Sequence, residues 1–209
     1  MGDHAKLSPS AADRWSVCTA APGLEALLPD KTSIYAEEGT KAHELLEACI
    51  RAHTPPSKIE FDFTGWENEE DEMRRFVQMA YDYIAPALGN PKVIVLSECR
   101  VELTPDCWGT VDIIKMDGGD IEIIDLKYGR GTLVEADSLQ LLVYAGGAIN
   151  SFGWMLTHPL ESVTRTVIQP RASHPSGPIR HAYASIEDTM EKIGEVIAPA
   201  IEAVRSGRS

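Results

Sequence analysis

The chain has 209 residues, of which 44% are hydrophobic and 24% are charged, and these values are ordinary for one globular domain with a sizeable core. The 32 acidic side chains outnumber the 19 lysines and arginines, which gives a net charge of −13. A chain this acidic cannot attract nucleic acid through its overall charge, so a nucleic-acid partner would require a local basic surface.

The sequence has no run of about 18 apolar residues, so no transmembrane helix is expected. Residues 1–15 also lack the apolar segment of a secretory signal, and we therefore expect a cytoplasmic protein. The four cysteines have no C-x-x-C spacing, which predicts reduced thiols and argues against a zinc site.

The N-terminal part, residues 1–91, is predicted to be mainly helical because its apolar residues recur at helical spacing. Ser8 or Ser10 can cap the first helix, in which Trp15 is expected to anchor the core. The helices predicted in this part cover residues 11–18, 36–53 and 70–88.

From residue 92 onward β-branched residues become frequent, which favours strands. The run Asp117-Gly118-Gly119-Asp120 is a strong hairpin signal. The predicted strands cover residues 92–103, 110–116, 121–127 and 163–169, with helices over 137–150 and 185–204 and a loop over 171–180. This order predicts a single α/β domain over residues 1–209, with a mixed central β-sheet flanked by helices. Residues 92–170 would form the sheet core, and residues 171–209 the closing loop and helix.

Charged residues on the predicted hairpin indicate a catalytic site. Asp125 and Lys127 are two apart on a strand, so both side chains point to the same face, where an internal salt bridge is the simplest alternative. Asp112 lies on the neighbouring strand, and Glu98 lies on the strand before. Carboxylates that approach one another repel unless a cation or a proton lies between them. Mg²⁺ and Mn²⁺ prefer such oxygen ligands, and Lys127 would supply a charge for an attacking water, as in metal-assisted phosphodiester hydrolysis.

Three further residues are candidates with structural alternatives. Gln140 and Tyr144 share a face of the following helix and could reach a ligand beside the strand, or they could be a hydrogen-bonded Gln and a core Tyr. His43 borders the apolar face of its helix, where a hydrogen-bonded, partly buried histidine is the alternative. Motifs of other enzymes are missing from the sequence: it has no P-loop, no G-x-G-x-x-G, no G-x-S-x-G and no H-E-x-x-H.

Short motifs follow one another in a definite order along the chain. They are G-T-x-x-H (Gly39, Thr40, His43), Glu98, G-x-x-D (Gly109, Asp112), D-x-K (Asp125, Lys127) and Q-x-x-x-Y (Gln140, Tyr144). In this order they resemble the RecB-like branch of the PD-(D/E)XK nuclease superfamily, and most closely a phage and prophage family related to the CRISPR-adaptation nuclease. The resemblance covers most of residues 7–200 and includes the flanking segment Ile168–Arg171.

The resemblance implies a restriction-endonuclease-like core and cleavage of DNA, from its ends, with Mg²⁺ or Mn²⁺. It implies metal ligation by His43, Asp112, Asp125 and the backbone carbonyl of Leu126, with Glu98 as a further ligand. Lys127 would orient the nucleophilic water, and Gln140 and Tyr144 would position the substrate. A histidine ligand favours Mn²⁺ more than an all-oxygen site would.

The chain departs from many such relatives, which carry an iron–sulfur cluster held by one N-terminal cysteine and three near the C-terminus. Cys18 stands where the first would be, but the sequence ends at Ser209 without the other three. Either the protein is a cluster-free short form or the chain is a truncated one; in both cases we expect no cluster in it, and we expect Cys18 to be a packed thiol.

Three functions remain open at this point. The first is a metal-dependent DNA exonuclease of phage recombination or repair, for which a single-strand annealing protein and a second copy of the chain are conceivable partners. The second is an idle nuclease fold that acts as a binding or assembly module, which the acidic charge favours. The third is a metal-dependent hydrolase of another substrate. If DNA is bound, Arg130 is the first candidate for its basic surface, followed by Arg165, Arg171 and Arg180.

Overall fold

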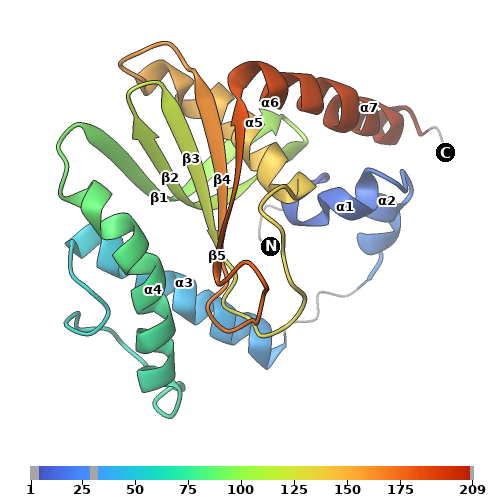
Figure 1. Cartoon of the computed structure of the whole chain (residues 1–209). Helices are drawn as coiled ribbons and strands as arrows, with labels where there is room; N and C mark the ends of the chain where they lie inside the picture. The colour runs from blue at the N-terminus through green and yellow to red at the C-terminus, as the bar shows by residue number, and fades with distance from the viewer. Residues whose placement is uncertain (1–4, 29–32, 208–209) are drawn as a thin grey trace.

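The computed structural model describes residues 5–28 and 33–207 and shows one mixed β-sheet with helices on both faces (Figure 1). Helices α3 (Ile34–Ala52) and α4 (Glu70–Leu88) cover one face. Helix α5 (Leu139–Phe152) covers the other face, and α6 (Ile186–Lys192) and α7 (Ala198–Ser206) lie beyond it. The predicted α/β domain with a mixed central sheet is confirmed.

The sheet has five strands in the order β1-β2-β3-β4-β5. Their bounds are β1 (Val93–Thr104), β2 (Cys107–Asp117), β3 (Asp120–Leu126), β4 (Ser162–Ile168) and β5 (Ile179–Ser185). All neighbours are antiparallel except β3 and β4, which are parallel and are joined across one face by α5. The tight turn between β2 and β3 lies at Gly118, whose φ of 61° suits a glycine.

The face under α3 and α4 is closed by apolar side chains that recur at helical spacing, among them Leu45, Leu46 and Ile84. Ser33 caps α3 by accepting a hydrogen bond from the backbone N–H of Ala36. The cap fixes where α3 begins, and the buried stripe fixes which side of the helix faces the sheet. The helix thereby carries His43 to the edge of β2.

A second and a third core lie on the α5 side. Helix α5 is buried along most of its length and packs on β1 to β4. Behind it, a short 3₁₀ turn (Pro9–Ala11), α1 (Ala12–Trp15) and α7 enclose a smaller core, and α2 (Ala21–Glu25) follows α1. Trp15 is 1% exposed and donates its indole N–H to the Ser8 carbonyl at 2.9 Å, so the predicted anchor is confirmed.

Three expectations about single segments and Cys18 are wrong. Residues 171–180 do not form a loop throughout, because β5 begins at Ile179 and pairs with β4. The closing helix over 185–204 is not continuous: a π turn at Ile193–Ile197 separates α6 from α7, next to Pro199, which has no N–H to donate. Cys18 is exposed rather than packed.

Among the residues that the structure describes, no helix is both long enough and apolar enough to cross a membrane.

Candidate functional site

The site begins where the alternation of β1 and β2 breaks. Glu98 and Asp112 would pair in the register that joins Ser97 to Ile113 and Cys99 to Val111, yet they form no ladder pair. Glu98 has a φ of 48°, which is unusual for a residue with a side chain. On both strands the buried residues change faces here: Val111 packs on the α5 side, whereas Ile113 packs under α3 and α4. The carboxylates of Glu98 and Asp112 therefore lie at an interruption of the β1–β2 ladder.

The edge between β2 and β3 opens at the same place. The ladder between these strands ends at Ile113 and Ile124, so the backbone of Leu126 has lost its β2 partner. Asp112 replaces it, because its Oδ2 accepts the Leu126 N–H at 2.6 Å. In an extended strand the N–H and C=O of one residue lie on the same edge, so the Leu126 carbonyl also faces this opening.

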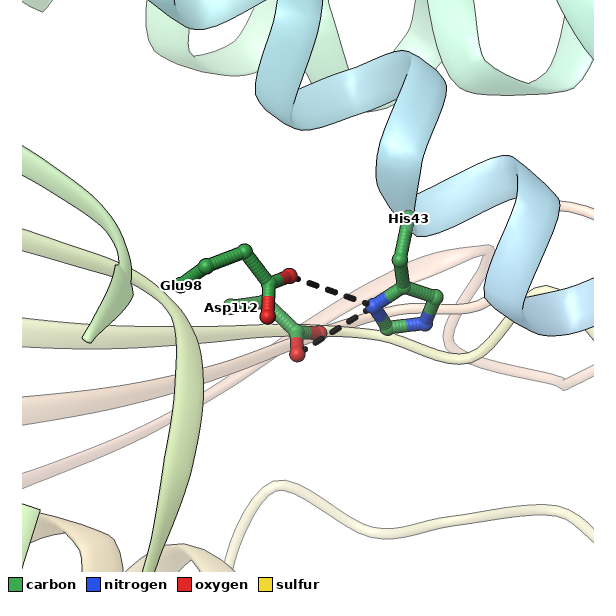
Figure 2. Close-up of side chains that lie close together, drawn as sticks. All are labelled: His43, Glu98 and Asp112. Atoms are coloured by element: carbon green, nitrogen blue, oxygen red, sulfur yellow. Dashed lines mark ion pairs between the residues drawn. The ribbon is translucent and has the colours of Figure 1, made fainter. Parts of the chain in front are cut away.

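His43 meets the two carboxylates from the opposite side. Its Nδ1 lies 3.3 Å from Asp112 Oδ1 and 3.8 Å from Glu98 Oε1, and Figure 2 shows the ring reaching from α3 toward both. One donor atom from each of these three residues lies within 4.8 Å of the others, a spacing that one metal ion can bridge. The three side chains come from α3 and from the consecutive strands β1 and β2, so the fold joins an N-terminal helix to a later pair of strands.

The electrostatics of this trio favour positive charge. Burial by itself lowers the pKa of His43, but the carboxylates of Asp112 and Glu98 outweigh burial and raise the pKa to about 10. The two carboxylates therefore stabilise a cation at this position, whether that cation is a proton on the imidazole or a metal ion.

A second group of polar side chains adjoins the trio. Lys127 Nζ lies 3.0 Å from Asp125 Oδ2 and donates to Gln140 Oε1 at 3.2 Å. Gln140 in turn donates to Asp125 Oδ1 at 3.4 Å. Asp125 Oδ2 is fully buried, and its approach to Lys127 lacks hydrogen-bond geometry. Burial raises the pKa of Asp125 even though Lys127 opposes the shift. Among the described residues Asp125 Oδ2 accepts no hydrogen bond, so the Lys127 ammonium balances its charge, and Asp125 is not one of the three residues whose donor atoms converge.

One cavity of about 970 Å³ joins the two groups. Its walls include all the catalytic and metal-binding residues expected from the sequence: His43, Glu98, Asp112, Asp125, Leu126, Lys127, Gln140 and Tyr144. Tyr144 packs against β2 at Gly109, where an added Cβ would lie 2.9 Å from the Tyr144 ring. The structure therefore brings these residues together, while their functions stay predictions.

Arg130 is placed differently. It lines a neighbouring cavity of about 870 Å³ and pairs with Glu72 at 2.5 Å. The other arginines expected on a basic surface are buried, which corrects that expectation: Arg165 and Arg180 are each 5% exposed, and the Arg171 side chain is 6% exposed. Burial of Arg180 is explained by hydrogen bonds to carbonyl and amide oxygens, and that of Arg171 by Glu38 at 2.7 Å.

Gln169 belongs to the site although its spacing did not reveal it. It lines the larger cavity and is 1% exposed. Its side chain forms hydrogen bonds with the loop that follows β3. Its Nε2 donates to the Thr132 carbonyl at 3.0 Å, while its Oε1 accepts from Arg180 at 2.8 Å and from the Val134 N–H at 3.3 Å. The only signal in the sequence was its place in the flanking segment Ile168–Arg171.

Comparison with known proteins assigns the family. The model of the family described as "Protein of unknown function (DUF2800)" matches residues 4–209, and the chain belongs to that family. The fold is similar to a crystal structure from Eubacterium rectale described as a "Putative exonuclease", with 15% identity and a TM-score of 0.50. The match covers 97% of this chain and 82% of that chain. At this identity the likeness concerns the fold, and it agrees with the mixed sheet flanked by helices.

Proposed function

We propose that the protein is a metal-dependent deoxyribonuclease that hydrolyses phosphodiester bonds from DNA ends. The observation that carries the proposal is the convergence, in one cavity, of the His43–Glu98–Asp112 trio with the Asp125–Lys127–Gln140 group. The exonuclease description of the similar fold supports the same choice of reaction. A role in phage recombination or repair remains an expectation from the resemblance of the motifs.

The residues fit a divalent cation on structural grounds. Glu98 and Asp112 oppose one another across two strands, and like charges in that position are destabilising unless a cation lies between them. The donors are two carboxylates and one imidazole, and the backbone carbonyl of Leu126 faces the same opening. This set suits Mn²⁺ as well as Mg²⁺. Bound there, the ion would polarise the phosphodiester and lower the pKa of a bound water.

The remaining side chains have separable tasks in this proposal. Lys127, held between Asp125 and Gln140, places a positive charge in the cavity that the trio also lines, where it would orient the attacking water and stabilise charge on the phosphoryl oxygens. Gln140 fixes the Lys127 ammonium by accepting its hydrogen bond. Tyr144 lines the same cavity and would position the substrate.

Digestion of DNA tests the proposal. End-labelled linear duplex, a closed circle of the same sequence and a single-stranded form are each incubated with wild type and Lys127→Ala in Mn²⁺, Mg²⁺ or EDTA. We expect metal-dependent loss of the linear DNAs, an intact circle, and a decrease of at least about 100-fold in the mutant. Cleavage of the circle would indicate an endonuclease in place of an exonuclease. DNA that stays intact with every metal would contradict the proposed nuclease activity.

The acidic surface favours one other function, a binding module with an idle nuclease fold. The net charge is −13, and Arg130, which lines the neighbouring cavity, is paired with Glu72. This alternative predicts neither metal binding nor cleavage. Metal binding without cleavage of any DNA would instead indicate a hydrolase of another substrate.

A further inference from the structure

A second cavity opens beside the proposed metal site. It has a volume of about 870 Å³ and shares Ala36, Gly129 and Gly131 with the larger cavity, so the two spaces meet at a wall of small residues. Added Cβ atoms would meet nothing within 4 Å at Gly131 and only the Gly131 backbone nitrogen, at 4.0 Å, at Gly129. Open space therefore adjoins both glycines where the two cavities meet.

The second cavity offers aromatic and aliphatic surface to a ligand. Tyr35 is 76% exposed and Ile34 is 66% exposed, although both lie in the first turn of α3 and line the cavity. Trp66 lines it as well and is half-buried, packed at the edge of the α3–α4 core. Large apolar side chains left exposed around a concave space indicate a binding surface.

The charged side chains of the cavity walls sum to −1, because Glu38, Glu69 and Glu72 outnumber Arg130 and Arg171. Arg130 pairs with Glu72 at 2.5 Å, and Arg171 pairs with Glu38 at 2.7 Å. A phosphate would have to displace a carboxylate from one of these pairs. A nucleobase would not, because its flat uncharged faces stack on aromatic rings. The cavity is thus suited to bases and poorly suited to phosphates.

We infer that this second cavity is a subsite for unpaired nucleobases of the strand whose phosphodiester lies in the metal cavity, with Tyr35 as its stacking platform. The inference rests on the proposed nuclease function and specifies its substrate as a single-stranded end. Bases in a duplex are stacked on their neighbours and paired, so only an unpaired end can present base faces to Tyr35 and Trp66.

The helix that joins the two sites gives the spacing. Tyr35 and His43 both lie on α3, and their positions along the helix axis differ by about 12 Å at 1.5 Å per residue. A stacked strand advances about 3.4 Å per nucleotide. The base at Tyr35 should therefore lie roughly three or four nucleotides from the scissile phosphate.

The experiment combines protein variants with abasic substrates. Labelled single-stranded oligonucleotides of about 12 nucleotides carry one abasic residue at successive positions from the end. On the intact oligonucleotide, Tyr35→Ala should lower kcat/KM by roughly 5- to 100-fold, the usual effect of losing one base–aromatic stack. Tyr35→Phe, which keeps the ring, should recover most of the loss. The penalty of Tyr35→Ala should vanish when the abasic residue occupies the third or fourth position.

Trp154 supplies the matched control. It is 79% exposed like Tyr35, but it lies on the 3₁₀ turn Gly153–Met155 and lines neither cavity, so Trp154→Ala should behave as wild type. Fluorescence anisotropy with the same oligonucleotides in Mn²⁺, on a Lys127→Ala background, repeats the comparison without cleavage.

The outcomes separate the two proposals. If wild type cleaves DNA and Tyr35→Ala equals it on every oligonucleotide, the base subsite is wrong and the nuclease stands. An equal loss on blunt duplex and on single strands would also overturn the subsite. If wild type binds single strands without cutting them, the anisotropy series alone decides the subsite and the nuclease falls. Neither binding nor cutting would overturn both.

Discussion

At the scale of single residues, the opposed pair Glu98 and Asp112 conflicts with the rules of sheet stability. Two like charges face each other across antiparallel strands, and Glu98 adopts a left-handed backbone that disfavours any residue with a Cβ. Strain of this kind persists at sites where it serves function. We interpret it here as the local cost of aiming two carboxylates at His43.

This interpretation predicts a difference between two substitutions of Glu98. Both Glu98→Ala and Glu98→Gly remove the repulsion, but only glycine relieves the left-handed φ of 48°. Without metal, Glu98→Gly should be more stable than Glu98→Ala by about 1 kcal/mol. Urea unfolding measures the difference. Equal stabilities, or a more stable alanine variant, would mean that the backbone at Glu98 is not strained.

At the scale of elements, the loop between β3 and α5 depends on one buried side chain. Gln169 at the end of β4 bonds to Thr132 and Val134 of this loop and to Arg180 of β5. The same loop supplies Gly129 and Gly131 to the cavity walls. Gln169 is therefore a positioning residue that joins the sheet to the wall of the site.

Gln169→Ala should lower the free energy of unfolding by about 1–3 kcal/mol, because it leaves buried donors and an acceptor without partners. Gln169→Glu keeps the acceptors for Arg180 and Val134 and loses only the donor to Thr132, so it should cost less. Urea unfolding and limited proteolysis within residues 129–136 compare the two. If alanine is tolerated better than glutamate, the network does not hold the loop.

A second tether fixes α7 to the turn between β1 and β2. Arg205 donates to both carboxylate oxygens of Asp106, at 2.6 and 3.1 Å, and Thr104 adds a third hydrogen bond. These bonds, chiefly that of Arg205, hold the pKa of Asp106 at about 2. The folded pKa lies below the value of about 3.9 expected in the unfolded chain, so the carboxylate stabilises the fold above that value.

This contribution should be lost as the pH falls from about 4 toward 2. Wild type should unfold at a higher urea concentration than Arg205→Met at pH 6, and the gap should close near pH 2. Circular dichroism across a pH series measures it. A gap that widens in acid would contradict the assigned partner.

Helices and strands were predictable from the sequence where apolar residues recur at regular spacing. They were not predictable where a buried polar side chain depends on hydrogen-bond partners distant in sequence. Helix α4 was predicted at its observed bounds because its buried residues follow helical spacing. Strand β5 was missed because its fully buried member is Arg180, which is accommodated by hydrogen bonds rather than by apolar contacts. The spacing of two residues placed Asp125 and Lys127 on one face, but only the register of the flanking pairs of β1 and β2 sets Glu98 opposite Asp112. The buried arginines likewise depend on partners distant in sequence.

At the scale of the whole molecule, the acidic charge restricts how DNA can be held. Arginines on several elements already pair with carboxylates, as Arg14 does with Glu25, Arg74 with Glu70 and Arg130 with Glu72. Phosphates would compete with these internal partners. Affinity in this account comes from the metal centre and from stacked bases rather than from a basic face.

Manganese binding is the most direct test that the cavity is a nuclease metal centre. Calorimetric titration of Mn²⁺ should give binding at the trio in wild type, a loss of about 10-fold or more in affinity for Asp112→Asn, and little change for Lys127→Ala, which is outside the ligand set. Because Lys127→Ala should retain the ion and lose cleavage, it separates metal binding from catalysis. Absence of binding in wild type, or undiminished binding by Asp112→Asn, would contradict the metal centre proposed here.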